Sequence, residues 1–245
     1  MGPADRIAAL EDYHRREVLA CVRCPLSEGR TQVVVGAGDP DADIMFVGEA
    51  PGYHEDQQGV PFVGQAGKLL GRLLEGIGLS RDQVFIANVL KCRPPENRNP
   101  RPEEIASCEP HLFRQIQLVR PRVVCTLGNF ATRLLSGRPE GITRVHGHEL
   151  PITVGGTSLL LYPLFHPAAA LYARATLSTL EADFARIPEL VAGEARAEPR
   201  PEPEVAPPPP GPEAQPQVET APEPGVAEGD ERREAGDPGS QLGLF

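Results

Sequence analysis

The sequence predicts an α/β fold, a three-layer αβα sandwich with a central, mainly parallel four-stranded sheet, followed by a disordered C-terminal tail. Short apolar segments alternate with helical patterns throughout residues 1–192, which is typical of strands joined by crossover helices. The apolar segments are continuous, as expected of strands that are covered on both faces. A third observation, the composition of residues 193–245, separates the tail from this domain.

Four segments are expected to form the strands of the sheet. Each is a run of consecutive apolar residues, which favours a strand buried on both faces. Because ligands of such sheets bind at the carboxyl ends of the strands, the residues that follow each run are the first candidates for a site. The segments are residues 44–47, 84–90, 123–127 and 159–164.

Four helices are expected in the same region. Residues 66–77 have apolar positions at helical spacing and precede Gly78, which favours a helix end. Residues 102–119 open with Pro-Glu-Glu, which suits a first helical turn, and residues 129–135 form a shorter helix. A last helix is predicted to begin at a capping box at Ser178, with one apolar stripe formed by Leu177, Leu180, Phe184 and Ile187.

The charge of the chain is unevenly distributed. The formal net charge of −10 divides into −2 for residues 1–192 and −8 for residues 193–245, and the second part contains 12 of the 28 prolines. A segment rich in proline and glutamate cannot bury enough apolar surface to offset the entropy of ordering. We therefore expect one folded domain over residues 1–192, which is long enough for a single core, and a disordered tail over residues 193–245.

Several classes of protein are excluded by composition. No apolar run reaches the roughly 18 residues that cross a bilayer, and the first 16 residues lack the apolar segment of a signal peptide. We expect a soluble, cytoplasmic protein that has no membrane partner and is a monomer. An odd count of five cysteines argues against a disulfide framework there, and favours metal ligation or buried thiols.

The cysteines have a spacing that suits metal binding. Cys21 and Cys24 form a Cys-x2-Cys pair, Cys92 follows the second predicted strand, and Cys108 lies 16 residues later in a predicted helix. Four thiolates of this kind bind either a zinc ion or a 4Fe-4S cluster, and the spacing alone leaves both open, as well as buried thiols. Cys125, within an apolar strand, is interpreted as a core residue.

Small residues follow the first predicted strand, at Gly48-Glu49-Ala50-Pro51-Gly52. A phosphate-binding loop is excluded in the segment that comes next, because Phe62 stands where that motif has its first glycine and Leu69 where it has a hydroxyl. Small residues instead allow a ligand to approach backbone amides, and Phe62 offers a stacking surface for a planar ring.

Two polar residues stand at the ends of other predicted strands. Asn88 interrupts the second apolar run, and an amide can both donate to and accept from the imide face of a pyrimidine. His166 follows the fourth strand and precedes a loop of small residues. Taken singly, Asn88 is better explained as a cap of the sheet edge or of a turn. A lone histidine is usually structural, although less often so at the carboxyl end of a strand before a loop of small residues.

Together these segments resemble the family-4, iron-sulfur branch of the uracil-DNA glycosylase superfamily. The resemblance covers about residues 16–190, nearly the whole predicted domain, and five motifs occur in the family's order and spacing. They are residues 48–52, 59–64, 88–95, 97–100 and 166–167.

The resemblance implies a DNA repair enzyme, a hydrolase that cleaves the N-glycosidic bond of uracil in single- or double-stranded DNA and leaves an abasic site. It implies one structural 4Fe-4S cluster, held by Cys21, Cys24, Cys92 and Cys108, and no nucleotide cofactor. Two alternatives remain open. One is a glycosylase that also removes other deaminated bases, and the other is a non-catalytic, zinc-stabilised DNA-binding module.

Chemistry on a base inside a duplex requires that the base be extruded from the stack. The resemblance implies that Phe62 stacks on the extruded uracil, that Asn88 hydrogen-bonds its imide edge, and that the backbone from Gly48 to Ala50 contacts the base and a neighbouring water. A donor from His166 is expected to stabilise the negative charge that develops on uracil O2.

Acidic residues have expected roles beside the base. Glu49 is expected to orient the attacking water or to stabilise the cationic sugar. Glu55 stands where the family excludes the 5-methyl group of thymine, although Tyr53 and His54 depart from the family's more acidic local sequence. Ala168 likewise replaces a serine that is common in the family.

Contacts to the DNA backbone and stack are expected from two other segments. Arg93, Arg98 and Arg101 suit phosphate contacts, although a solvated charged loop explains them equally well. Leu171 is the candidate for a wedge that fills the vacated stack, with Tyr172 second, and both are equally compatible with a buried helix start.

The tail ends in a short apolar motif. Its residues, Gln241, Leu242, Gly243, Leu244 and Phe245, resemble the pentapeptide that binds the bacterial sliding clamp. An apolar tip on a tether has nothing of its own to pack against, which favours docking into a partner. We therefore expect the sliding clamp as a partner, with Gln241, Leu242, Leu244 and Phe245 making the contact.

Overall fold

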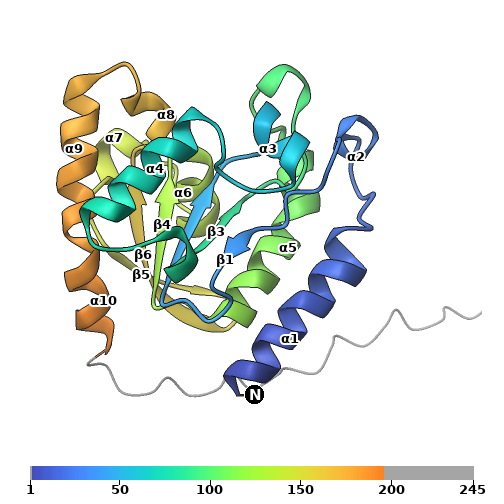
Figure 1. Ribbon diagram of the computed structural model, residues 1–245, viewed down its shortest axis with the longest axis horizontal. Helices are drawn as coiled ribbons and strands as arrows, with labels where there is room; N and C mark the ends of the chain where they lie inside the picture. Colours follow the sequence, from blue (N-terminus) through green and yellow to red (C-terminus); the bar gives the residue numbers. More distant parts are fainter. Residues whose placement is uncertain (1, 196–245) are drawn as a thin grey trace, which may run out of the picture. The chain divides into compact units, whose positions relative to one another are not determined.

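The computed structural model describes residues 2–195, and these form an α/β domain built on one six-stranded sheet (Figure 1). The strand order is β1-β3-β2-β4-β6-β5, and the four inner strands run parallel while both edge strands pair antiparallel. The strands are β1 (Ala37–Gly38), β2 (Ile44–Gly48), β3 (Phe85–Asn88), β4 (Val123–Leu127), β5 (Leu150–Val154) and β6 (Thr157–Leu164).

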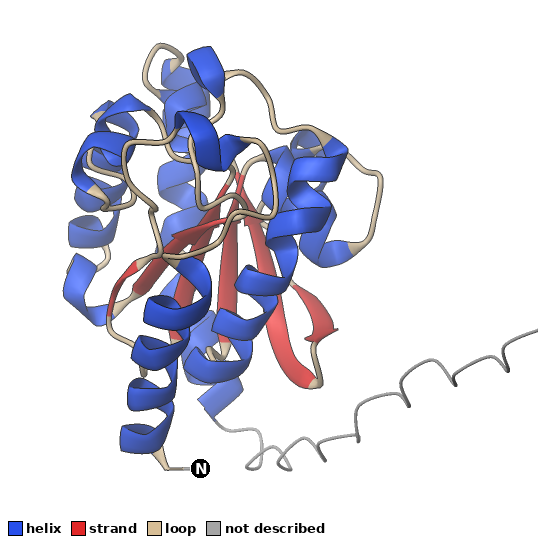
Figure 2. Ribbon diagram, turned by 90° about the vertical axis from the view of Figure 1, so that its right-hand side faces the viewer, coloured by secondary structure: helices blue, strands red, loops and turns tan. Residues whose placement is uncertain are grey.

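Helices cover both faces of this sheet, as Figure 2 shows from the side. One layer contains α1, α5 and α6, and the other contains α4, α8, α9 and α10. The long helices are α1 (Pro3–Tyr13), α4 (Gln65–Gly76), α5 (Pro102–Val119), α6 (Asn129–Ser136), α9 (Arg174–Ala185) and α10 (Ile187–Ala195). The short ones are η1 (His14–Val18), α2 (Leu26–Gly29), α3 (Tyr53–Gln58), η2 (Arg81–Gln83), η3 (Pro95–Asn97), α7 (Ile142–Val145) and α8 (Pro167–Ala170).

Two apolar clusters, one on each face, make the core. Along β2, Met45 and Val47 face the cluster under α1 and α5, while Ile44 and Phe46 face the cluster under α4 and α9. This division follows from the two-residue period of a strand. It explains why the four inner strands are mostly apolar along both faces, and it confirms the predicted three-layer α/β sandwich.

The structure corrects three details of the prediction. The sheet has six strands rather than four, because β1 and β5 extend it at its two edges. The last predicted helix begins at Arg174 rather than at Ser178, and a second helix follows it from Ile187. That helix, α10, continues to Ala195, so residues 193–195 are helical rather than part of a tail, and the remaining predicted tail lies outside the described residues.

No helix among residues 2–195 is long and apolar enough to span a bilayer.

The parallel strands bring separate parts of the chain to one edge of the sheet. Gly48 is the last residue of β2 and pairs with Asn88, the last residue of β3, while β6 ends at Leu164, two residues before His166. The polar residues that the sequence placed at strand ends therefore share one edge, where a ligand is expected in this class of fold.

Candidate functional site

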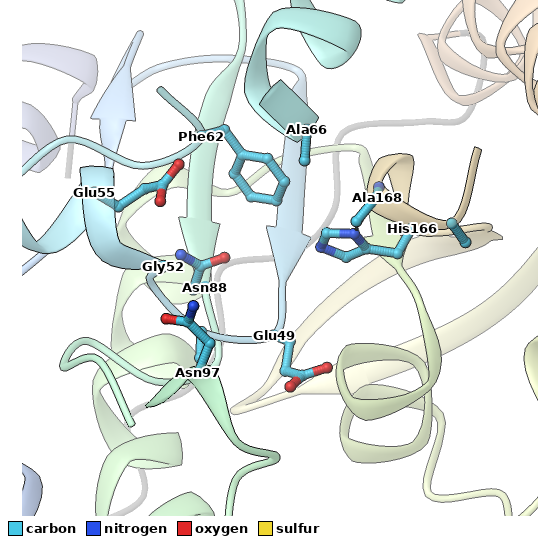
Figure 3. Close-up of a pocket in the computed structure, with 11 residues that line it drawn as sticks. Glu49, Gly52, Glu55, Phe62, Ala66, Asn88, Asn97, His166 and Ala168 are labelled. Carbon is cyan, nitrogen blue, oxygen red and sulfur yellow. Dashed lines mark hydrogen bonds between the residues drawn. The ribbon is translucent and has the colours of Figure 1, made fainter. Parts of the chain in front are cut away.

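A cavity of about 490 Å³ lies at this edge of the sheet (Figure 3). Six of the predicted site residues line it, namely Glu49, Ala50, Glu55, Phe62, Asn88 and His166. The prediction missed the other five, Gly52, Ala66, Asn97, Ala168 and Ala169. Residues from four separate segments of the chain thus surround one space.

Gly48 lies beside the cavity and leaves room for the side chains of Asn88 and Phe62. A Cβ atom at this position would lie 2.4 Å from Asn88 Oδ1 and 2.5 Å from Phe62 Cζ. Both distances are shorter than real Cβ atoms show. Glycine is therefore required at position 48 because the amide and the aromatic ring pass directly over its backbone.

The amide of Asn88 has an acceptor without a protein partner. The side chain is only 2% exposed, and Oδ1 is buried without a hydrogen bond to any other described residue. A buried polar atom left unpaired costs roughly 1–3 kcal/mol. Since Asn88 lines the cavity, a ligand that brings an N–H donor to this oxygen would remove that cost.

Phe62 enters the cavity in a strained backbone conformation. Its φ is 54°, in the left-handed region that residues with a Cβ rarely adopt. The backbone of α4 passes so close that a Cβ at Gly67 would lie 1.8 Å from the carbonyl oxygen of Phe62. The ring lies 5.7 Å from that of His166, with an angle of 29° between their planes. Strain held in this way is typical of a residue whose placement matters to function.

Two side chains hold the backbone on either side of Phe62. Glu55 Oε1 accepts hydrogen bonds from the backbone N–H groups of Val63 and Gly64, both at 2.9 Å. On the other side, Arg81 donates to the carbonyl oxygen of Pro61 at 2.7 Å. The carboxylate of Glu55 therefore fastens the stacking loop as well as forming part of the cavity wall, a function that the sequence did not indicate.

His166 is a neutral hydrogen-bond donor in this structure. Its Nδ1 accepts a hydrogen bond from the backbone N–H of Ala168 at 3.1 Å, which leaves the ring proton on Nε2. Burial lowers the pKa of His166 to about 4, although the charge of Glu55 opposes this shift. The imidazole is therefore uncharged near neutral pH.

Glu49 is half-buried in the wall of the same cavity. Burial raises the pKa of its carboxyl group. Its backbone carbonyl accepts a hydrogen bond from Leu90 N at 3.0 Å, which ties the turn after β2 to the turn after β3.

The loop after β3 contains the three predicted phosphate contacts, and the structure gives them different surroundings. Arg98 forms two hydrogen bonds to Glu104, at 2.9 and 2.5 Å, so its guanidinium holds the loop to the start of α5. Arg93 donates to Asn97 Oδ1 at 2.7 Å and lies over the ring of Tyr53. Arg101 is exposed.

The predicted wedge residues also differ in exposure. Leu171 is half-buried and packs against the cluster under α4 and α9, whereas Tyr172 is 94% exposed. Tyr172, the second candidate for the wedge, is therefore the more accessible of the two side chains.

The four predicted ligand cysteines lie in one neighbourhood beside α5. Burial raises the pKa of the Cys92 and Cys108 thiols, and the neighbouring Cys24 adds to the shift of both pKa values. Arg30 donates to Cys92 Sγ at 3.2 Å and also to the backbone carbonyl oxygen of Cys21 at 2.7 Å. Cys125 is fully buried within β4, as predicted for a core residue.

Two N–H groups donate to sulfur atoms of these cysteines. One belongs to the Arg30 guanidinium, and the other is the backbone N–H of Lys91, which donates to Cys108 Sγ at 3.3 Å. Within residues 2–195, no three His, Cys, Asp or Glu side chains are arranged to hold a metal ion.

Comparison with known proteins agrees with the geometry. Residues 35–187 match the family model described as the uracil DNA glycosylase superfamily. The chain is 46% identical to a type-4 uracil-DNA glycosylase of Sulfurisphaera tokodaii over 181 residues, which cover 72% of this chain and 82% of the relative. It is 44% identical to the type-4 enzyme of Archaeoglobus fulgidus, with 71% of this chain and 90% of the relative covered. A type-5 enzyme of Thermus thermophilus is 34% identical over 52% of the chain and 66% of its own length.

Proposed function

We propose that this chain, which belongs to the uracil-DNA glycosylase superfamily, hydrolyses the N-glycosidic bond of uracil in DNA and leaves an abasic site for base excision repair. The observation that carries this assignment is the buried, unpartnered Oδ1 of Asn88, which faces a cavity beside an aromatic ring and a neutral imidazole donor.

Recognition of uracil follows from these groups. An enzyme that acts on a base must first extrude it from the duplex. In the cavity, Phe62 stacks on the ring, Asn88 Oδ1 accepts the imide N–H, and the Asn88 amide nitrogen donates to the adjacent carbonyl oxygen. Cytosine presents an acceptor in place of that N–H, so it would leave Asn88 Oδ1 facing a lone pair.

Cleavage of the bond leaves negative charge on uracil O2 and positive character on the sugar. The Nε2–H of His166 donates to O2, and a neutral donor suffices because the charge appears only as the bond breaks. The carboxylate of Glu49 orients the attacking water or stabilises the sugar cation. Glu55 occupies the wall that would meet the 5-methyl group of thymine, in addition to holding the backbone of Val63 and Gly64.

Four cysteines would hold a 4Fe-4S cluster, namely Cys21, Cys24, Cys92 and Cys108. Each iron of such a cluster takes one thiolate, so the sulfur atoms need not meet at one point as the ligands of a single ion do. The shared neighbourhood of the thiols and the two N–H donors fit this group. When bound, it would supply cross-links between the N-terminal segment, the end of β3 and α5.

A single oligonucleotide assay tests the function. The full-length chain is incubated with single- and double-stranded oligonucleotides that contain one uracil, and alkali then cleaves any abasic site. We expect cleavage at uracil and none at the control bases thymine, hypoxanthine and xanthine. Cleavage at hypoxanthine and xanthine would establish the broader glycosylase, and no cleavage at uracil by iron-loaded protein would contradict both enzymatic proposals.

The C-terminal motif gives a second proposal, about a partner, for residues that lie outside the described part of the chain. We propose that residues 241–245 dock the enzyme on the bacterial sliding clamp, with the acidic segment before them acting as a tether that avoids DNA phosphates.

Deletion of residues 241–245 is therefore expected to abolish clamp binding in calorimetric titration, while excision of uracil from short oligonucleotides stays unchanged. The matched control deletes residues 212–216, an equal length of the same tail. Equal clamp affinity of the two deletion variants would refute the proposed docking.

A further inference from the structure

Lys91 is a charged residue buried between the cavity and the cysteines. Its side chain is 1% exposed and is among the largest fully buried side chains of the described residues. The ammonium donates to the backbone carbonyl oxygen of Asn88 and to Gln115 Oε1, each at 2.6 Å. Burial of a charge costs several kcal/mol unless it is well paired, so a lysine here calls for an explanation beyond packing.

Gln115 is held so that its oxygen faces Lys91. Its Nε2 donates to the backbone carbonyl oxygen of Val35 and to His14 Nε2. Burial lowers the pKa of His14 to about 4, so the ring is neutral and can accept that hydrogen bond. With both amide protons directed away, Oε1 is left as the acceptor for the ammonium, and the position of Nζ is fixed from α5.

The other hydrogen bond of the ammonium acts on the backbone of Asn88. The carbonyl of Asn88 closes β3, and the chain turns there toward Cys92. Bonds from Val89 and Leu90 to the carbonyl groups of Gly48 and Glu49 hold the next two residues. The Lys91 ammonium therefore holds the backbone carbonyl of Asn88 itself, the residue whose side-chain amide lines the cavity.

We propose that Lys91 is a positioning residue for base recognition, which acts by fixing the backbone of Asn88 so that its amide faces the uracil ring. This inference rests on the proposed function, because it assigns Lys91 to the same site. Lys91 does not touch the substrate. Its hydrogen bond to the Asn88 backbone keeps Oδ1 above Gly48, where a Cβ atom would be too close to that oxygen.

Replacement of Lys91 by methionine tests this role in the iron-loaded, full-length chain. Methionine keeps the length and apolar stem of the side chain and removes the donor. We expect single-turnover excision of uracil to slow on the order of 10²-fold, the cost of misplacing a recognition group by about 1 Å. The matched control is Lys68→Met, which removes the other lysine of the chain from an exposed position on α4.

A double-mutant comparison separates positioning from mere stability. If Lys91 acts through Asn88, then Lys91→Met has almost no further effect, within about twofold, in an Asn88→Ala background. A full activity of Lys91→Met, or an equal loss in both backgrounds, would overturn the proposal. An inactive wild-type enzyme would instead contradict the proposed function.

A second variant covers the case in which Lys91→Met loses iron or fails to fold. Gln115→Leu removes the acceptor that holds Nζ, and it leaves Lys91 and all four proposed ligand cysteines unchanged in the sequence. We expect a smaller loss of uracil excision that again disappears in the Asn88→Ala background, with iron content unchanged. An additive loss there would overturn the positioning role.

Discussion

Substitution of His166 by alanine is expected to lower kcat/KM for uracil excision on the order of 10²–10³-fold, the usual effect of removing one donor to a developing anion. The structure places the proton on Nε2 because Ala168 N–H occupies Nδ1. The donor is therefore set in direction before the substrate binds. Its interaction strengthens as charge appears on uracil O2, so the loss should fall mainly on kcat.

The measurement is single-turnover excision on a uracil-containing oligonucleotide. His148→Ala is the matched control, because that histidine is exposed and lies outside the cavity. A His166→Ala variant that retains the wild-type rate, or that changes only KM, would show that His166 does not stabilise the transition state.

The pH dependence follows from the same residue. Because the pKa of His166 is about 4 in the folded chain, excision should show no inflection from this group between pH 5 and 8. The pKa of His166 is near 6.5 in the unfolded chain and about 4 in the folded chain. Between these two pH values, the imidazole therefore binds a proton in the unfolded chain but not in the folded chain. The free energy of unfolding therefore falls as pH falls through this window, by at most about 1.4 kcal/mol per pH unit from this group, and His166→Ala should flatten that slope.

The inner strands could be predicted because burial on both faces leaves a continuous apolar run. The edge strands left weaker signals. β1 contains only Ala37 and Gly38, and a two-residue strand has no periodicity. Along β5, exposed Pro151 and Thr153 alternate with less exposed neighbours, and Gly155-Gly156 follows. That combination does indicate a hairpin, so β5 could have been predicted from turn residues.

Site residues at strand ends were predictable because topology alone brings them together. Asn97 was missed because its place in the cavity depends on two successive residues, Glu96 and Asn97, that both have φ of 55°. Asparagine is enriched in this conformation but glutamate is not, so the sequence does not mark two such residues in succession. The pairing of Arg98 with Glu104 was equally hidden, since it depends on how the loop folds onto the first turn of α5.

The second large effect is expected at the cysteines. Cys108→Ser should abolish the brown colour and iron content of the purified chain and lower the free energy of unfolding by about 4 kcal/mol or more, as loss of a structural metal group does. The thiol of Cys108 lies on α5 and accepts a hydrogen bond from Lys91 N, so it anchors the end of β3 to that helix. Without a cluster, Cys21 and Cys24 would lose the cross-links to Cys92 and Cys108 that the cluster supplies, and the hydrogen bonds of His14 and Arg30 would remain.

Cys125→Ser provides the matched comparison, because the same atom is exchanged at a cysteine that is buried in β4 and remote from the proposed ligands. It should cost some stability, since burial disfavours an unpaired hydroxyl, but leave visible absorbance and iron content unchanged. Equal iron content in Cys108→Ser and Cys125→Ser would contradict the ligand assignment. A colourless wild-type chain that contains zinc would instead favour the DNA-binding module, and the uracil assay would then test the enzymatic proposal separately.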